Sequence, residues 1–130
     1  MNLIRTAAVG TVAAIVAALI VYFIADAASG PLLVTPAGAD EAQELPLGAV
    51  IASTIFGGIV GTLVALVARR LSRPRTLFLS VCIVGLLLSF ITPFTGSEET
   101  STAIWLVIMH IAVAIPIVGS LARFLPEQKA

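Results

Sequence analysis

The side chains that could do chemistry in this sequence are few, and they centre on its only histidine. His110 lies inside the apolar segment from Ile104 to Gly119. Four hydroxyl side chains are expected at similar depth or slightly nearer the outer surface of the molecule: Tyr22, Ser53, Thr54 and Ser89. An ionisable residue inside an apolar helix of a membrane protein usually faces the protein interior and is often functional. These five residues are therefore a candidate intramembrane polar cluster.

Two hypotheses account for His110. The imidazole could sense pH or contact a ligand, or it could stay neutral and hydrogen-bond one of the four hydroxyls, which would link helices. A proton relay or ion path normally contains several buried carboxylates or histidines, and this sequence has one histidine and no carboxylate within an apolar run. The sequence therefore favours the structural hypothesis.

Metal, cofactor and enzyme chemistry find little support in these residue types. A structural zinc site needs four Cys or His ligands, and the chain has one histidine and one cysteine, Cys82. Haem ligation by His110 would need a second ligand, and Met109 points about 100° away on the same helix. The sequence shows no nucleophile beside a base, no paired buried carboxylates and no glycine-rich phosphate loop. We expect no metal, no cofactor and no enzymatic activity.

The composition requires lipid as the surroundings of most of the chain. Of the 130 residues, 59% are hydrophobic and 11% are charged, and the mean hydropathy is +1.13. Soluble domains have about 45–50% apolar and about 25% charged residues. A soluble domain of this length could not bury so much apolar surface, so residues 1–130 form a single integral membrane domain.

Four apolar segments are long enough to cross a hydrocarbon core of about 30 Å. They are residues 3–25, 47–68, 76–92 and 103–122. Because lipid cannot satisfy free backbone groups, each should be a helix. We therefore expect an all-α membrane protein whose four transmembrane helices form an up-down-up-down bundle. The outer loop 26–46 is rich in Pro, Gly and acidic residues and is expected to be extended or partly disordered.

The formal net charge is zero, but the charges are strongly divided between the two sides of this arrangement. All basic residues fall on one side: Arg5, Arg69, Arg70, Arg73, Arg75, Arg123 and Lys129. Six of the seven acidic residues fall on the other: Asp26, Asp40, Glu41, Glu44, Glu98 and Glu99. Short basic loops stay in the cytoplasm, so both termini and the inner basic turn 69–75 are predicted to be cytoplasmic. The protein would then be a multi-pass protein of the cytoplasmic (inner) membrane.

The first span has a competing interpretation as a secretory signal. Arg5, an apolar stretch and the small residues at 25–29 imitate a signal peptide cleaved after Ala27. The rule that short basic loops stay in the cytoplasm does not separate the two interpretations, because removal of the first span would leave the orientation of the other three unchanged. Because the apolar run exceeds the usual signal core of about 7–15 residues, we expect the span to be retained.

Small residues recur at every fourth position in two of the spans. The second span carries Ala49, Ser53, Gly57, Gly61 and Ala65, and the first carries Gly10, Ala14 and Ala18. Small side chains let helix backbones approach closely in lipid, where the hydrophobic effect drives little association. We expect these stripes to be packing seams, either with each other or across a homodimer.

The inner basic turn also has two interpretations. Its arginines Arg69, Arg70, Arg73 and Arg75 could bind anionic lipid head groups or an acidic partner, since each such residue near an anionic membrane contributes about 1 kcal/mol. They could equally act only as the orientation signal. The sequence favours the second interpretation.

The second half of the chain resembles a known family. The stretches RRLSRPR, LLLSFITPFT and TSTAIWLVIMHIAVAIPIVG are similar to small bacterial four-span membrane proteins grouped as family sixty sixty-nine of the domains of unknown function. The resemblance implies that Pro93 and His110 correspond to recurring features of that family. It implies no activity.

These observations lead to one functional expectation and one alternative. We expect an uncharacterised, non-enzymatic accessory or structural membrane subunit or a small homo-oligomer, with the lipid bilayer and either a membrane-protein partner or a second copy as its contacts, and no nucleic acid. The alternative is a small transporter or channel whose pathway passes His110.

Overall fold

Helices make up most of the computed structural model, which describes residues 2–128. In chain order the elements are α1 (Leu3–Ser29), β1 (Leu33–Val34), β2 (Gln43–Glu44), α2 (Leu47–Ala68), α3 (Pro74–Ser89), α4 (Ile91–Gly96) and α5 (Thr100–Phe124). Four helical spans are long and apolar enough to cross a membrane: α1, α2, α3 together with α4, and α5. The predicted fold class, an all-α membrane protein with four spans, is confirmed.

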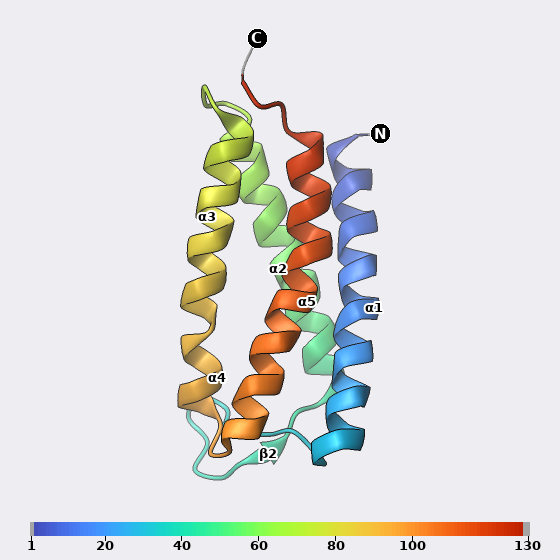
Figure 1. Ribbon diagram of the computed structural model, residues 1–130, viewed down its shortest axis with the longest axis vertical. Helices are drawn as coiled ribbons and strands as arrows, with labels where there is room; N and C mark the ends of the chain where they lie inside the picture. The colour runs from blue at the N-terminus through green and yellow to red at the C-terminus, as the bar shows by residue number, and fades with distance from the viewer. Residues whose placement is uncertain (1, 129–130) are drawn as a thin grey trace.

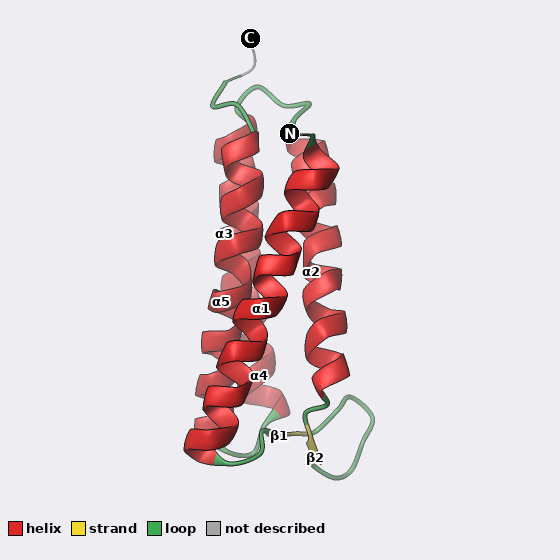
Figure 2. Cartoon of the chain, turned by 90° about the vertical axis from the view of Figure 1, so that its right-hand side faces the viewer, coloured by secondary structure: helices red, strands yellow, loops and turns green. Residues whose placement is uncertain are grey.

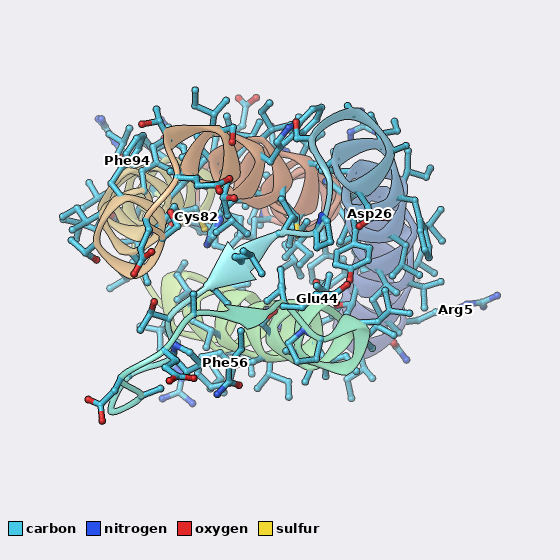
Figure 3. The ribbon with its side chains drawn as sticks, turned by 90° about the horizontal axis from the view of Figure 1, so that it is seen from below. Arg5, Asp26, Glu44, Phe56, Cys82 and Phe94 are labelled. Carbon is cyan, nitrogen blue, oxygen red and sulfur yellow. The ribbon has the colours of Figure 1, made fainter. Side chains whose placement is uncertain are left out.

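The spans run alternately in opposite directions, and the N-terminus and the end of α5 lie at the same end of the molecule (Figure 1). The basic turn between α2 and α3 is at that end too, which we call the inner end. The strands β1 and β2 lie at the opposite, outer end (Figure 2). Large apolar side chains face outward, such as Phe56 on α2 and Phe94 on α4, which are 67% and 58% exposed (Figure 3). An apolar exterior of this kind suits lipid rather than water.

The second helix has the predicted bounds, whereas the other three spans extend further. The third span also breaks at Phe90, which separates α3 from α4. Pro93 explains the break, since it has no N–H to donate to the carbonyl of Ser89 and its ring crowds that carbonyl. The sequence predicted one uninterrupted helix over 76–92, and the proline just beyond that segment ends it early.

The outer loop is more ordered than expected, because it folds into a small hairpin. Strands β1 and β2 pair in antiparallel register, with Leu33 opposite Glu44. The backbone N–H of Leu45 donates to the carbonyl of Leu32 at 2.8 Å, and that of Thr35 donates to the carbonyl of Gly96 at 2.8 Å. The second of these bonds ties the hairpin to α4. Of the two expectations for this loop, the extended conformation is the one that β1 and β2 show.

A close approach between helices joins α1 to α5. A Cβ atom added at Gly10 would lie 2.9 Å from Ser120 Oγ and 3.0 Å from the Pro116 carbonyl oxygen. Such distances leave no space for a side chain, so the α1 backbone rests directly on α5. Ala14 and Ala18 continue this buried line of α1. The small residues of α1 thus form a seam as expected, but at Gly10 the partner is α5, not α2.

The seam on α2 differs from the predicted stripe. A Cβ atom at Gly58 would overlap Thr11 Oγ1 of α1, and one at Gly61 would lie 3.2 Å from a methyl group of Ile117 on α5. Gly57, in contrast, has no atom within 4 Å of such a Cβ position, and Ala49 and Ser53 are exposed. Within this chain Gly61 packs against another helix, whereas Ala49, Ser53 and Gly57 do not. The alternative expectation, packing of these residues across a homodimer, stays a prediction.

Helix geometry explains why the predicted stripe does not follow the contact line of α2 within the chain. A step of four residues turns about 400°, so an every-fourth-residue line drifts by about 40° per step. From Ala49 to Ala65 the drift is about 160°, nearly half the helix circumference. A straight contact line must mix steps of three and four, as the buried residues of α2 do: Val50, Thr54, Gly58, Ala65 and Ala68.

The interior divides into two buried clusters. Near the inner end, Phe78, Leu121 and Leu125 are fully buried and fill the space between α3 and α5. Toward the outer end, smaller or more flexible residues such as Ala18 and Met109 pack with Leu32 of the loop. The inner half is therefore closed by large side chains, while the outer half is completed by the hairpin.

Adjacent glycines test the α1–α2 seam. Gly58→Leu should force Thr11 and the α1 backbone away and lower the free energy of unfolding by about 1–3 kcal/mol, the usual cost of overpacking. For the isolated chain Gly57→Leu is the matched control, because it makes the same gain in helix propensity at a position with open space within the chain. Thermal unfolding in mild detergent, followed by circular dichroism, compares the two. Equal stability of both variants would contradict the observed seam.

Candidate functional site: the outer cavity

A cavity of about 430 Å³ lies at the outer end of the molecule, beneath the hairpin. Its walls come from four parts of the chain: the hairpin segments 34–37 and 43–46, Ala49 of α2, three residues of α4, and Leu106 and His110 of α5. Seen from the outer end, β1 and β2 lie across the space between α2 and α5 (Figure 3). The hairpin therefore roofs the cavity, and His110 lies deepest along α5 from the outer surface.

The wall of the cavity is mainly apolar with a few polar groups. The apolar part includes Pro36, Leu45, Pro93 and Leu106. The polar side chains are Thr35, Gln43, Glu44, Thr92 and His110. Small-molecule sites commonly have this composition and enclose about 300–1,000 Å³. By size and lining, this cavity is the candidate site.

The hydrogen bonding of His110 fixes which ring nitrogen is available. Nδ1 lies 2.6 Å from the backbone carbonyl oxygen of Leu106, one turn earlier in α5. A carbonyl oxygen only accepts, so Nδ1 carries the proton and donates. In the neutral imidazole, Nε2 is then an acceptor. A ligand that reached Nε2 of the neutral imidazole would therefore meet a hydrogen-bond acceptor.

The structure does not join the five predicted polar residues into one cluster. Three hydroxyls donate to carbonyls of their own helix: Ser53 to Val50 at 3.1 Å, Thr54 to Val50 at 2.8 Å and Ser89 to Leu86 at 2.6 Å. Ser and Thr in helices commonly bond the preceding turn in this way. His110 does likewise, so its hydrogen bond lies within α5 instead of linking two helices.

Tyr22 has a different role from the one expected. Its hydroxyl donates to the backbone carbonyl of Leu45 at 3.0 Å, which ties α1 to the strand end of the hairpin. A second tether joins Trp105 Nε1 to Ser29 Oγ at 2.9 Å, which links α5 to the end of α1. Trp105 was not among the residues predicted from the sequence, although Trp and Tyr are enriched at membrane interfaces. This enrichment could have identified Trp105 from the sequence as a residue near the outer membrane surface.

At the inner end, the four arginines of the basic turn differ in their contacts. Arg75 donates from Nε to the carbonyls of Ala122 and Leu125 at 2.9 and 3.1 Å, and its Nη1 pairs with Glu127 at 2.9 Å. It thereby satisfies free carbonyls at the C-terminus of α5. The guanidinium of Arg69 lies 5.8 Å from the centre of the Phe124 ring, a cation–π contact. Only Arg70 and Arg73 remain without a side-chain partner within residues 2–128.

Metal binding finds no support in the geometry. Within residues 2–128, no group of three or more His, Cys, Asp or Glu side chains is arranged to hold a metal ion. The thiol of Cys82 is half-buried on α3 and remains unpaired in that part of the chain. His110 therefore stands apart from other metal-binding side chains.

Comparison with known proteins gives one match. Residues 1–127 match a family described as a family of unknown function (DUF6069). The match spans both halves of the chain, including all four helical spans. No curated protein and no solved structure matches the chain.

Removing the hydroxyl of Tyr22 tests the tether that roofs the cavity. Tyr22→Phe should leave the Leu45 carbonyl without this donor and weaken hairpin closure by about 1 kcal/mol. The amides of Thr35 and Leu45 should then exchange with deuterium about fivefold faster, since 1.4 kcal/mol corresponds to a factor of ten. Phe56→Leu, at an exposed position on α2, is the control. Identical exchange in Tyr22→Phe and wild type would contradict the tether.

Proposed function

The chain belongs to the DUF6069 family, whose function is unknown, and we propose that it is a non-enzymatic accessory or structural subunit of the cytoplasmic membrane. In this proposal the protein acts by contacting another membrane protein or a second copy of itself. The proposal rests on the outward face of α2, on the closed inner half and on the charge distribution.

The charge distribution supports a cytoplasmic location of both termini. Arg5, the basic turn and Arg123 belong to the inner end, together with the N-terminus and the end of α5 (Figure 1). Asp26, the hairpin and Glu98 belong to the outer end. Basic residues next to membrane spans remain in the cytoplasm. The cavity would then open on the outer half of the bilayer.

The observation that carries the proposal is the small-residue face of α2, formed by Ser53 and Gly57. Ser53 is exposed, and open space surrounds the Cβ position of Gly57. Small residues at a spacing of four allow another helix to approach closely in lipid. The chain uses neighbouring Gly58 and Gly61 for its own packing, so this face stays available for a helix from a partner.

The glycines of α2 and α3 provide a matched test. Gly57→Leu should displace a partner helix, while Gly85→Leu on α3 makes the same substitution at another position with open space around it. Native mass spectrometry after mild detergent extraction should show a second protein chain with the wild type and Gly85→Leu, and its loss from Gly57→Leu. A bare monomer in all three samples would exclude the subunit proposal.

Transport is the alternative, and the outer cavity that reaches His110 favours it. Against it, the inner interior is filled by Phe78, Leu121 and Leu125, and the hydroxyls of Ser53 and Ser89 bond their own helices. A transport pathway would need polar groups through this half as well.

Flux measurements separate the two functions. We expect proteoliposomes containing the wild type to release protons and monovalent cations no faster than empty liposomes, because apolar side chains close the inner half. A flux that is present in the wild type, absent from His110→Ala and retained in Ser80→Ala would instead support transport. Ser80 is an exposed position on α3 that bonds its own helix.

A further inference from the structure

A second concave surface lies between α2 and α3, near the inner end. It is a groove of about 310 Å³. All its lining side chains are apolar, and they include Leu63, Val64 and Val67 of α2, Leu71 of the turn, and Leu77 and Val81 of α3. Such a lining offers no hydrogen bond to a ligand. It suits a hydrocarbon chain.

Two arginines of the basic turn lie close in sequence to a residue of the groove wall. Arg70 and Arg73 are exposed and flank the short stretch that contains Leu71, a residue of the groove wall. The other two arginines of the turn are engaged, Arg69 with Phe124 and Arg75 with the end of α5. In the described part of the chain, no carboxylate lies in salt-bridge contact with Arg70 or Arg73.

We propose that the groove and these two arginines bind an anionic phospholipid of the surrounding bilayer. One acyl chain lies between α2 and α3, against Val64 and Val81, and the phosphate lies at the turn near Arg70 and Arg73. Charge complementarity selects this occupant over an apolar helix, because guanidinium groups match phosphate oxygens in charge and geometry. A zwitterionic head group would bring its own ammonium and bind less well.

This site is separate in depth from the partner face used in the proposed function. Val64 lies seven residues after Gly57, about two helical turns closer to the inner end and on nearly the same side of α2. Lipid and partner helix would therefore occupy successive parts of one helix face. A variant that no longer binds the lipid can therefore still bind the partner helix, and the reverse also holds.

Lipid titration tests the two halves of the proposal separately. The detergent-purified full-length protein is titrated with phosphatidylglycerol or phosphatidylcholine, and native mass spectrometry measures the bound fraction. We expect tighter binding of phosphatidylglycerol. In Arg70→Gln/Arg73→Gln this binding should weaken about 30-fold, because each basic residue near an anionic surface contributes about fivefold. Arg5→Gln/Arg123→Gln, which removes two exposed arginines outside the groove, should bind like the wild type.

A matched pair of valine substitutions tests the apolar half of the site. Val81→Trp fills the groove, whereas Val84→Trp places the same side chain on α3 outside it; the two valines are 52% and 56% exposed. Phosphatidylglycerol binding should fall in the first variant and persist in the second. Three results would each overturn the proposal: equal binding of the two lipids, an equal loss in the Arg5/Arg123 variant, or undiminished binding in Val81→Trp. Circular dichroism of each variant checks that its helices are retained.

Discussion

The direct contact between the backbones of α1 and α5 at Gly10 is the constraint on which the rest of the arrangement depends. Apolar side chains gain little by leaving lipid for the protein interior, so helices in a bilayer associate through close van der Waals contact and a few polar bonds. Gly10 removes the side chain that would keep the helices apart, and Ser120 and Pro116 occupy the space. Because α1 also meets α2 through Thr11 and Gly58, one helix positions both neighbours.

The arrangement of segments at the outer end depends on the same contact between α1 and α5. Once α1 and α5 lie together, Ser29 and Trp105 come within hydrogen-bond distance, and Tyr22 can reach the hairpin at Leu45. The hairpin then meets α4 through Thr35 and Gly96. The cavity is thus enclosed by segments that the α1–α5 contact brings into reach, and His110 belongs to its wall because α5 supplies one side.

The parts of the fold that depend on local composition could be predicted from the sequence. Long apolar runs revealed all four spans, and the bounds of α2 were predicted as they stand in the structure. Contacts between distant residues were harder to predict. The hairpin has only two residues in each strand and depends on the distant carbonyl of Gly96, so its loop composition gave no clue. The contact line of α2 within the chain passes through Gly58 instead of Gly57, because residues spaced four apart do not form a straight line along the helix.

The site was partly predictable for a similar reason. The solitary His110 stood out by residue type, but the sequence could not show that its Nδ1 bonds the carbonyl of Leu106. In a bilayer, a polar group must find its partner within the protein, and the nearest carbonyl on the same helix is always present. Interhelical polar bonds are instead concentrated near the ends of the molecule, where Trp105 joins Ser29 and Arg75 reaches Ala122 and Leu125. Small residues hold the middle of the spans and polar tethers hold their ends, so His110 can line the outer cavity without being needed to join helices.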